Sequence, residues 1–140
     1  GNPYGDPWSV DILSTWVEKL DRLGARTLSL SDTVGTASAS LLFEVFSQLM
    51  PAFPHFHFGA HLHCKPAHAI EKIASAFNGG CRRFDGAIRG YGGCPMAKDE
   101  LVGNLPTEKI LSFCSLKKLD HSINPLHFES AYNIALNTYR

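Results

Sequence analysis

Apolar residues recur along the chain with two kinds of spacing that alternate from one end to the other. Intervals of three and four residues predict helices over residues 8–23, 37–50, 66–77, 107–119 and 126–138. Short apolar runs between them predict strands over residues 27–30, 56–62 and 83–88, and a last short strand over residues 122–124. Gly24 is placed to close the first helix and Pro51 to end the second. Strands that alternate with helices indicate a parallel sheet with crossover connections.

The number of predicted strands bears on the architecture. A (β/α)₈ barrel needs eight strands and about 250 residues, whereas this chain has 140 residues and offers three or four strands. It opens with the segment NPYG at residues 2–5, which resembles the loop at the end of a strand that is itself missing. We therefore predict an α/β fold, the C-terminal half of a TIM (β/α)₈ barrel, as a single partial-barrel domain over residues 1–140.

Composition narrows the class of protein. Hydrophobic residues make up 44% of the chain and charged residues 19%, which is typical of a folded protein. A net charge of zero gives no overall electrostatic attraction to nucleic acid or to an anionic membrane. No apolar run approaches the roughly 20 residues of a bilayer span. The four cysteines do not form CxxC pairs and no secretory signal is visible, so we expect reduced thiols in a cytoplasmic protein.

Polar side chains follow three successive predicted strands. Asp32 comes after the first strand, His61 and His63 end the second, and Cys94 and Asn104 lie in the long loop after the third. In parallel sheets with crossover helices, functional groups collect at the carboxyl ends of the strands. The sequence therefore predicts a site to which all three strand ends contribute.

The histidine pair is a candidate metal site. On a strand, side chains two residues apart face the same side, so His61 and His63 can reach one ion. Imidazole suits Zn²⁺, Mn²⁺ or Fe²⁺ better than Mg²⁺, and Asn104 can add a carbonyl oxygen. A hydrogen-bonded histidine pair and a turn role for Asn104 remain open from these residues alone. Cys64 raises a zinc–thiolate alternative, although on a continuing strand it should face the opposite side.

The local sequence leaves more than one role open for the other reactive groups. Cys94 follows two glycines and precedes Pro95, and its thiol could act as an acid, a base or a redox-sensitive group depending on its pKa. The Asp32 carboxylate could cap the next helix or face the site. Arg82 and Arg83 are interpreted as solvated, with phosphate binding as the alternative.

Four segments together resemble the hydroxymethylglutaryl-CoA lyase family of barrel metallolyases. They are NPYG at residues 2–5, SLSDTVG at 29–35, HLH at 61–63, and the stretch from GGCPMA to GNLPTE at 92–108. The resemblance runs over nearly the whole chain. Related synthases usually carry a Gly-Glu-Arg-type segment in place of the cysteine loop, so the lyase branch fits better.

The resemblance implies a carbon–carbon lyase that depends on a divalent cation and cleaves 3-hydroxy-3-methylglutaryl-CoA to acetyl-CoA and acetoacetate. It implies that His61, His63 and Asn104 bind Mg²⁺ or Mn²⁺, with Zn²⁺ less favoured. The family's fourth ligand, an aspartate, and its catalytic arginine belong to an Arg-Asp motif that this chain lacks. Cys94 is implied to close over the substrate and move protons, and Asp32 to lie near the acid–base chemistry, so Cys94, Asp32 and His61 are the implied catalytic residues.

The implied partner is an acyl-CoA substrate, with no nucleic acid and no membrane. We expect no turnover from the 140-residue chain alone, because one metal ligand and the arginine are missing. A related aldolase or condensing enzyme with another acyl substrate, and a non-catalytic half barrel that binds metal, remain alternatives. Open sheet edges predict self-association into a homo-oligomer.

Overall fold

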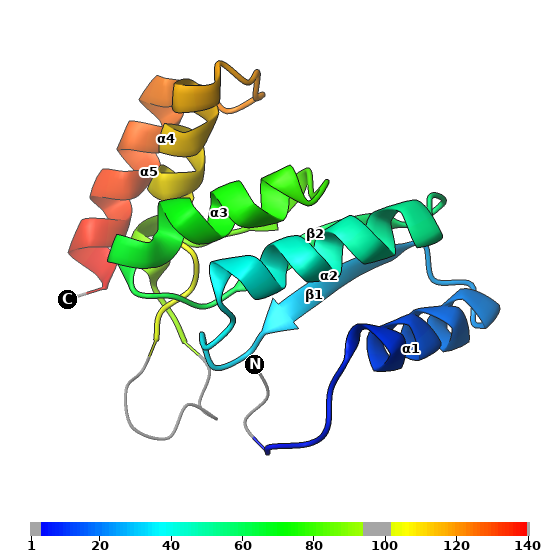
Figure 1. The fold of residues 1–140 in the computed structure, drawn as a ribbon. Helices are drawn as coiled ribbons and strands as arrows, with labels where there is room; N and C mark the ends of the chain where they lie inside the picture. Colours follow the sequence, from blue (N-terminus) through cyan, green and yellow to red (C-terminus); the bar gives the residue numbers. More distant parts are fainter. Residues whose placement is uncertain (1–3, 94–101, 140) are drawn as a thin grey trace.

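A three-stranded parallel sheet organises the structure, a computed structural model that describes residues 4–93 and 102–139 (Figure 1). Strands β1 (Thr27–Asp32), β2 (His57–Leu62) and β3 (Arg83–Asp85) lie side by side in the order of the sequence. Thr27 pairs with His57, and Gly59 pairs with Arg83. This register brings the carboxyl ends of β1, β2 and β3 to the same edge of the sheet.

Helices connect the strands and extend the chain beyond them. α1 (Val10–Arg22) precedes β1, α2 (Ala39–Ala52) joins β1 to β2, and the short 3₁₀ helix η1 (Pro66–His68) with α3 (Ala69–Asn78) joins β2 to β3. The 3₁₀ helix η2 (Ile88–Gly90), α4 (Thr107–Lys117) and α5 (Pro125–Thr138) follow β3. Side-chain oxygens of Ser9, Ser38 and Asn124 accept hydrogen bonds from backbone N–H groups in the first turns of α1, α2 and α5.

The predicted alternation of helices and parallel strands is confirmed, with differences at the ends of elements. β3 stops at Asp85 and does not continue to residue 88, because Gly86 and Ala87 lead directly into η2. The predicted strand at residues 122–124 is wrong, since these residues are the coil that leads into α5, with Asn124 as its N-cap. Pro51 lies inside the last turn of α2, which ends at Ala52.

The two faces of the sheet differ in chemistry. Phe58, Ala60 and Leu62 of β2 are buried and belong to one core with Phe46 and Leu49 of α2. Helices α2 and α3 run next to each other across this face (Figure 1). On β1, every second residue belongs to the opposite face of the sheet: Thr27, Ser29 and Ser31 are exposed there. Three described strands agree with a partial barrel but do not establish it, and the single domain over residues 1–140 stays a prediction.

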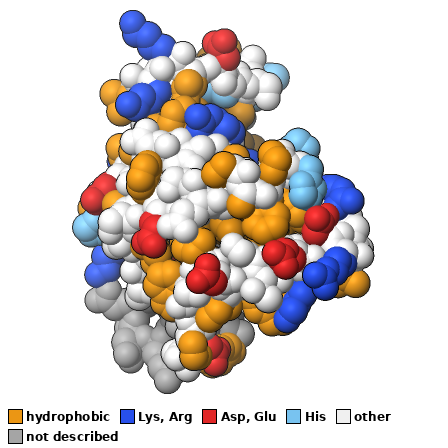
Figure 2. All heavy atoms as spheres, turned by 45° about the vertical axis from the view of Figure 1, so that its right-hand side comes forward, with side chains coloured by type: hydrophobic (Ala, Val, Ile, Leu, Met, Phe, Trp, Pro, Cys, Tyr) orange, Lys and Arg blue, Asp and Glu red, His pale blue; other side chains and the backbone are white. Residues whose placement is uncertain are grey.

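Large hydrophobic side chains are also exposed. Trp8, just before α1, and Trp16, within α1, are 54% and 56% exposed. Hydrophobic groups lie between charged ones over the face seen in Figure 2. The predicted homo-oligomer would cover such surface and remains a prediction. Within residues 4–93 and 102–139, no helix has both the length and the apolar character needed to cross a bilayer.

Candidate metal centre

His61 and His63 lie together at the carboxyl end of β2. His61 is in the strand and His63 is the first residue beyond it. Their ring centroids are 5.3 Å apart, and the ring planes meet at 75°. The two imidazoles are therefore neighbours, as their spacing in the sequence predicts.

The hydrogen bonding of His63 fixes which ring nitrogen is free. Nδ1 of His63 lies 3.1 Å from the backbone oxygen of Asp32. A carbonyl oxygen can only accept, so Nδ1 carries the proton and Nε2 keeps a lone pair. A histidine that donates its other ring N–H to a carbonyl is the usual arrangement of a metal ligand.

His61 faces a carboxylate. Its Nδ1 lies 3.5 Å from Oδ2 of Asp85. That carboxylate also accepts a 2.8 Å hydrogen bond from Ser29 Oγ and pairs with Arg83 Nη1 at 3.2 Å. Because the carboxylate attracts a proton onto Nδ1, it favours the tautomer in which Nε2 of His61 is also free to bind a cation.

Asn104 is brought to the histidines by the return of the chain after the long loop. It forms an isolated antiparallel bridge with His63. Its Nδ2 donates a 2.8 Å hydrogen bond to the backbone oxygen of Tyr91, which leaves Oδ1 as a neutral ligand oxygen. A Cβ on Gly92 would lie 2.9 Å from that Nδ2, so a glycine at this position of the loop makes room for the Asn104 amide.

The donor set suits a divalent cation with mixed nitrogen and oxygen ligands. His61, His63 and Asn104 offer two imidazole nitrogens and one amide oxygen, a combination that fits Mn²⁺ or Zn²⁺ and also occurs with harder ions. In the described part of the chain, no three His, Cys, Asp or Glu side chains come together as a metal cluster. A site here therefore depends on the Asn104 amide as its third ligand.

The zinc–thiolate alternative does not fit this geometry. Cys64 is only 2% exposed and packs with Ala69, Ile73 and Leu105 in a second core cluster. Burial raises the pKa of its thiol, which disfavours the thiolate that zinc requires. The side chain lies within the core, as its place after the histidine pair predicts.

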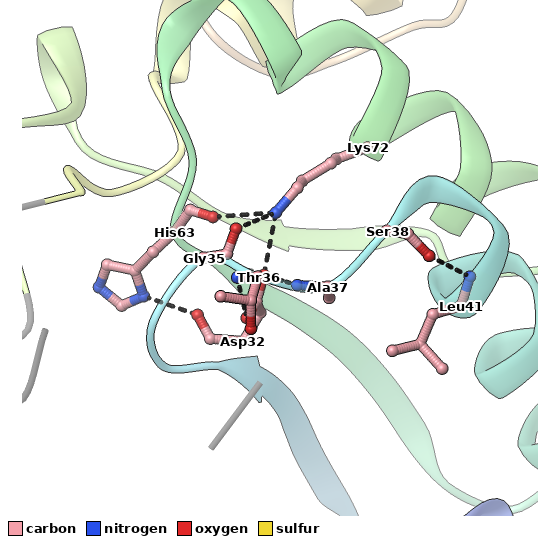
Figure 3. Close-up of polar contacts among 8 residues, drawn as sticks. All are labelled: Asp32, Gly35, Thr36, Ala37, Ser38, Leu41, His63 and Lys72. Atoms are coloured by element: carbon pink, nitrogen blue, oxygen red, sulfur yellow. Dashed lines mark hydrogen bonds and ion pairs between the residues drawn. The ribbon is translucent and has the colours of Figure 1, made fainter. Parts of the chain in front are cut away.

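The carboxylate of Asp32 is buried next to the histidines and is bound from several directions. Its oxygens accept hydrogen bonds from the backbone N–H groups of Thr36 and Ala37, both at 3.0 Å, and from Lys72 Nζ at 2.9 Å (Figure 3). Burial alone favours the neutral acid, but the hydrogen bond and the charge of Lys72 are among the effects that outweigh it, so the pKa of Asp32 is lowered.

An ionised, 2% exposed Asp32 is a poor proton carrier. The geometry favours the structural alternative: Asp32 fixes the loop that leads into α2, whose N-cap is Ser38. The implied catalytic role of Asp32 therefore has no support from its contacts. Cys94 lies outside the described residues, so its role as a mobile acid or base stays a prediction.

Two charged groups near the site were not predicted from the sequence. Arg83 is not simply solvated, since its guanidinium donates to Ser29 Oγ and pairs with Asp85. The alternation of Arg83 and Asp85 on a predicted strand was the available signal. Lys72 was missed although it stands at helical spacing between apolar Ala69 and Ala76.

Comparison with known proteins shows the family to which the chain belongs. A family model described as HMGL-like matches residues 7–134. Hydroxymethylglutaryl-CoA lyase YngG of Bacillus subtilis is 32% identical over 124 residues, which are 89% of this chain and 40% of that protein. The crystal structure of the Bacillus subtilis HMG-CoA lyase superimposes with a TM-score of 0.85 at 28% identity, over 98% of this chain and 46% of that one.

A further solved structure is an HMG-CoA lyase from Acinetobacter baumannii in complex with coenzyme A and 3-methylmalate. It matches with a TM-score of 0.76 at 27% identity, over 89% of this chain and 40% of that one. The chain thus spans less than half the length of each of these relatives. Because the family model covers most of the sequence, the chain belongs to the HMGL-like family.

Proposed function

We propose that this chain is the metal-binding, C-terminal part of a divalent-cation-dependent lyase that cleaves 3-hydroxy-3-methylglutaryl-CoA to acetyl-CoA and acetoacetate. The observation that carries the proposal is the bond from His63 Nδ1 to the Asp32 carbonyl oxygen, which leaves Nε2 free beside His61 and Asn104. Mg²⁺ or Mn²⁺ is the proposed cation.

Each residue has a separate task in this proposal. His61 and His63 hold the cation through Nε2, and Asn104 holds it through Oδ1. When bound, the cation supplies Lewis acidity that lowers the pKa of a coordinated hydroxyl group. Asp85 and the Asp32 carbonyl oxygen keep the two imidazoles in the tautomer that binds metal. Cys94 is proposed to move a proton from the loop after η2.

The family supports a proposal for the substrate class. The relative from Acinetobacter baumannii binds coenzyme A and 3-methylmalate, and we propose an acyl-CoA thioester with a 3-hydroxy group for this chain. The activity of the whole protein, its partial-barrel architecture and a cytoplasmic location belong to the same proposal. The described cysteines, Cys64, Cys81 and Cys114, are free thiols, which suits a reducing compartment.

Titration of Mn²⁺ into the purified chain, followed by electron paramagnetic resonance, tests the metal centre. We expect one bound Mn²⁺ in the wild type, and at least tenfold weaker binding in His61→Ala and in His63→Ala. His57→Ala is the matched control, because His57 begins the same strand and is exposed. Unchanged Mn²⁺ affinity in both site variants would overturn the proposal.

Activity is tested with 3-hydroxy-3-methylglutaryl-CoA and Mn²⁺, with detection of acetyl-CoA. We expect no turnover from the 140-residue chain and turnover from a longer protein in which these residues follow an Arg-Asp-containing segment. In that longer protein, Asn104→Ala should reduce turnover and Mn²⁺ affinity together. Turnover that is independent of divalent cations would contradict the proposed chemistry.

A further inference from the structure

Lys72 is a buried lysine at the carboxyl ends of the strands. It lies on α3, and its side chain is 8% exposed. Its ammonium donates to Asp32 Oδ2 at 2.9 Å, to the backbone oxygen of Gly35 at 2.9 Å and to the backbone oxygen of His63 at 3.3 Å (Figure 3). An ammonium group has three donors, so these three bonds use all of them.

The three acceptors come from separate segments. Asp32 ends β1, Gly35 lies in the loop that follows, and His63 is the first residue after β2. The imidazole of His63 in turn donates to the backbone oxygen of Asp32. Lys72, Asp32 and His63 therefore close a ring of hydrogen bonds that fixes both the backbone and the side chain of His63.

Stability alone is a weak reason for this arrangement. A buried ion pair gains little net stability over neutral groups of similar shape, because both charges lose their hydration. Here the charged group reaches two strand ends at once and contacts the backbone of a candidate metal ligand. Those contacts point to control of position.

We propose that Lys72 is a positioning residue for the candidate metal centre, an inference that rests on the proposed function. It holds the ends of β1 and β2 at the separation that keeps His63 Nδ1 on the Asp32 carbonyl oxygen. Nε2 of His63 is then presented to the cation in a fixed direction. Lys72 does not touch the cation or the substrate in this role.

The test uses the double variant Lys72→Met/Asp32→Asn, which removes both charges and keeps similar side-chain volumes. Lys72→Met alone takes the lysine charge away from the buried Asp32 carboxylate and is expected to lose stability. The double variant removes both charges, so a loss of Mn²⁺ binding in it is not caused by an uncompensated buried carboxylate. Lys117→Met is the matched control, because it removes one positive charge from an exposed position. Melting temperature, Mn²⁺ affinity and the ¹⁵N chemical shifts of the His63 imidazole are measured for each protein.

We expect the double variant to remain folded with a lower melting temperature, because the carbonyl oxygens of Gly35 and His63 lose their donor. It should bind Mn²⁺ about 10- to 100-fold more weakly and show a mixture of His63 tautomers. The control should match the wild type in all three measurements. Wild-type Mn²⁺ affinity together with a single Nδ1–H tautomer in the double variant would overturn the inference.

Failure of the proposed function gives a different pattern. If the wild type binds no Mn²⁺, the metal centre is wrong, and the tautomer of His63 still decides whether Lys72 fixes the ring. A wild-type tautomer with the proton on Nε2 would overturn the positioning role whatever the metal result.

Discussion

Substitution of Gly35 tests how tightly the loop between β1 and α2 packs against His63. Its φ is +74°, and a Cβ added there would lie 2.9 Å from Val102 Cγ1 and 3.0 Å from the backbone oxygen of His63. The valine methyl could move. The carbonyl oxygen is held by Lys72 and can move only with the end of β2.

Two costs add in Gly35→Ala. The left-handed backbone conformation costs an L-residue about 1–2 kcal/mol, and the overpacking adds about 1–3 kcal/mol. Gly24→Ala separates them, because Gly24 has φ of +86° and no heavy atom within 4 Å of an added Cβ. Both substitutions change the entropy of the unfolded chain alike, so we expect Gly35→Ala to lose about 1–3 kcal/mol more than Gly24→Ala.

Urea denaturation followed by circular dichroism measures this difference. With a denaturant slope of about 2 kcal/mol per molar, the midpoint of Gly35→Ala should lie about 1 M below that of Gly24→Ala. We also expect weaker Mn²⁺ binding in Gly35→Ala only, since only there does the backbone of His63 have to shift. Equal midpoints for the two variants would refute the idea that this loop is sterically locked to His63.

Three further outcomes can be checked on the same protein. The folded pKa of Asp32 lies below the ordinary 3.8. Its ionised form therefore stabilises the fold above that pH, and this contribution disappears as the pH falls through the folded pKa. The free energy of unfolding should fall more steeply with pH below about pH 4 in the wild type than in Asp32→Asn. Burial raises the pKa of Cys81 to about 11, so iodoacetamide at neutral pH should label Cys114 in the native protein and Cys81 only after unfolding, as mass spectrometry would show. Phe46 is fully buried and Phe43 is 48% exposed, so Phe46→Ala should cost about 3–5 kcal/mol in urea denaturation and Phe43→Ala well under half of that.

The sequence was sufficient for features that depend on periodicity. Helical spacing located the five long helices of the described residues. The spacing marks a buried stripe most clearly in α2, where Leu42, Val45, Phe46 and Leu49 are buried, whereas α5 buries only Ala135. The i, i+2 spacing of His61 and His63 was also sufficient to place both rings together. Periodicity is a local property, so a single chain carries it without reference to its fold.

Contacts across the fold could not be derived in this way. The role of the Asp32 carboxylate depends on its contact with Lys72, which is 40 residues away in the sequence and lies on another element. The orientation of the Asn104 amide depends on the backbone oxygen of Tyr91, which the long loop brings back to it. A carboxylate after a strand is equally compatible with catalysis and with a structural ion pair until its partner is known.

The contribution of the Arg83–Asp85 ion pair to stability depends on whether the polar face of the sheet is covered. Arg83 and Asp85 pair at 3.2 Å with side chains that are 41% and 34% exposed, so water screens the pair and its contribution is under about 1 kcal/mol. If a barrel closes over this face, the same pair loses its water, and removal of one partner would cost about 3–5 kcal/mol.

Arg83→Met therefore has a different expected effect in the two settings. In the 140-residue chain it should change the urea midpoint very little, and in a longer protein that completes the barrel it should lower the midpoint strongly. Ser29 and His61 stay next to the Asp85 carboxylate in both cases, but neither supplies the permanent positive charge of Arg83, so the difference reports on whether water can compensate the carboxylate. A loss of several kcal/mol in the 140-residue chain would show that this face is already covered, for example by self-association, and would refute the interpretation of an open polar face.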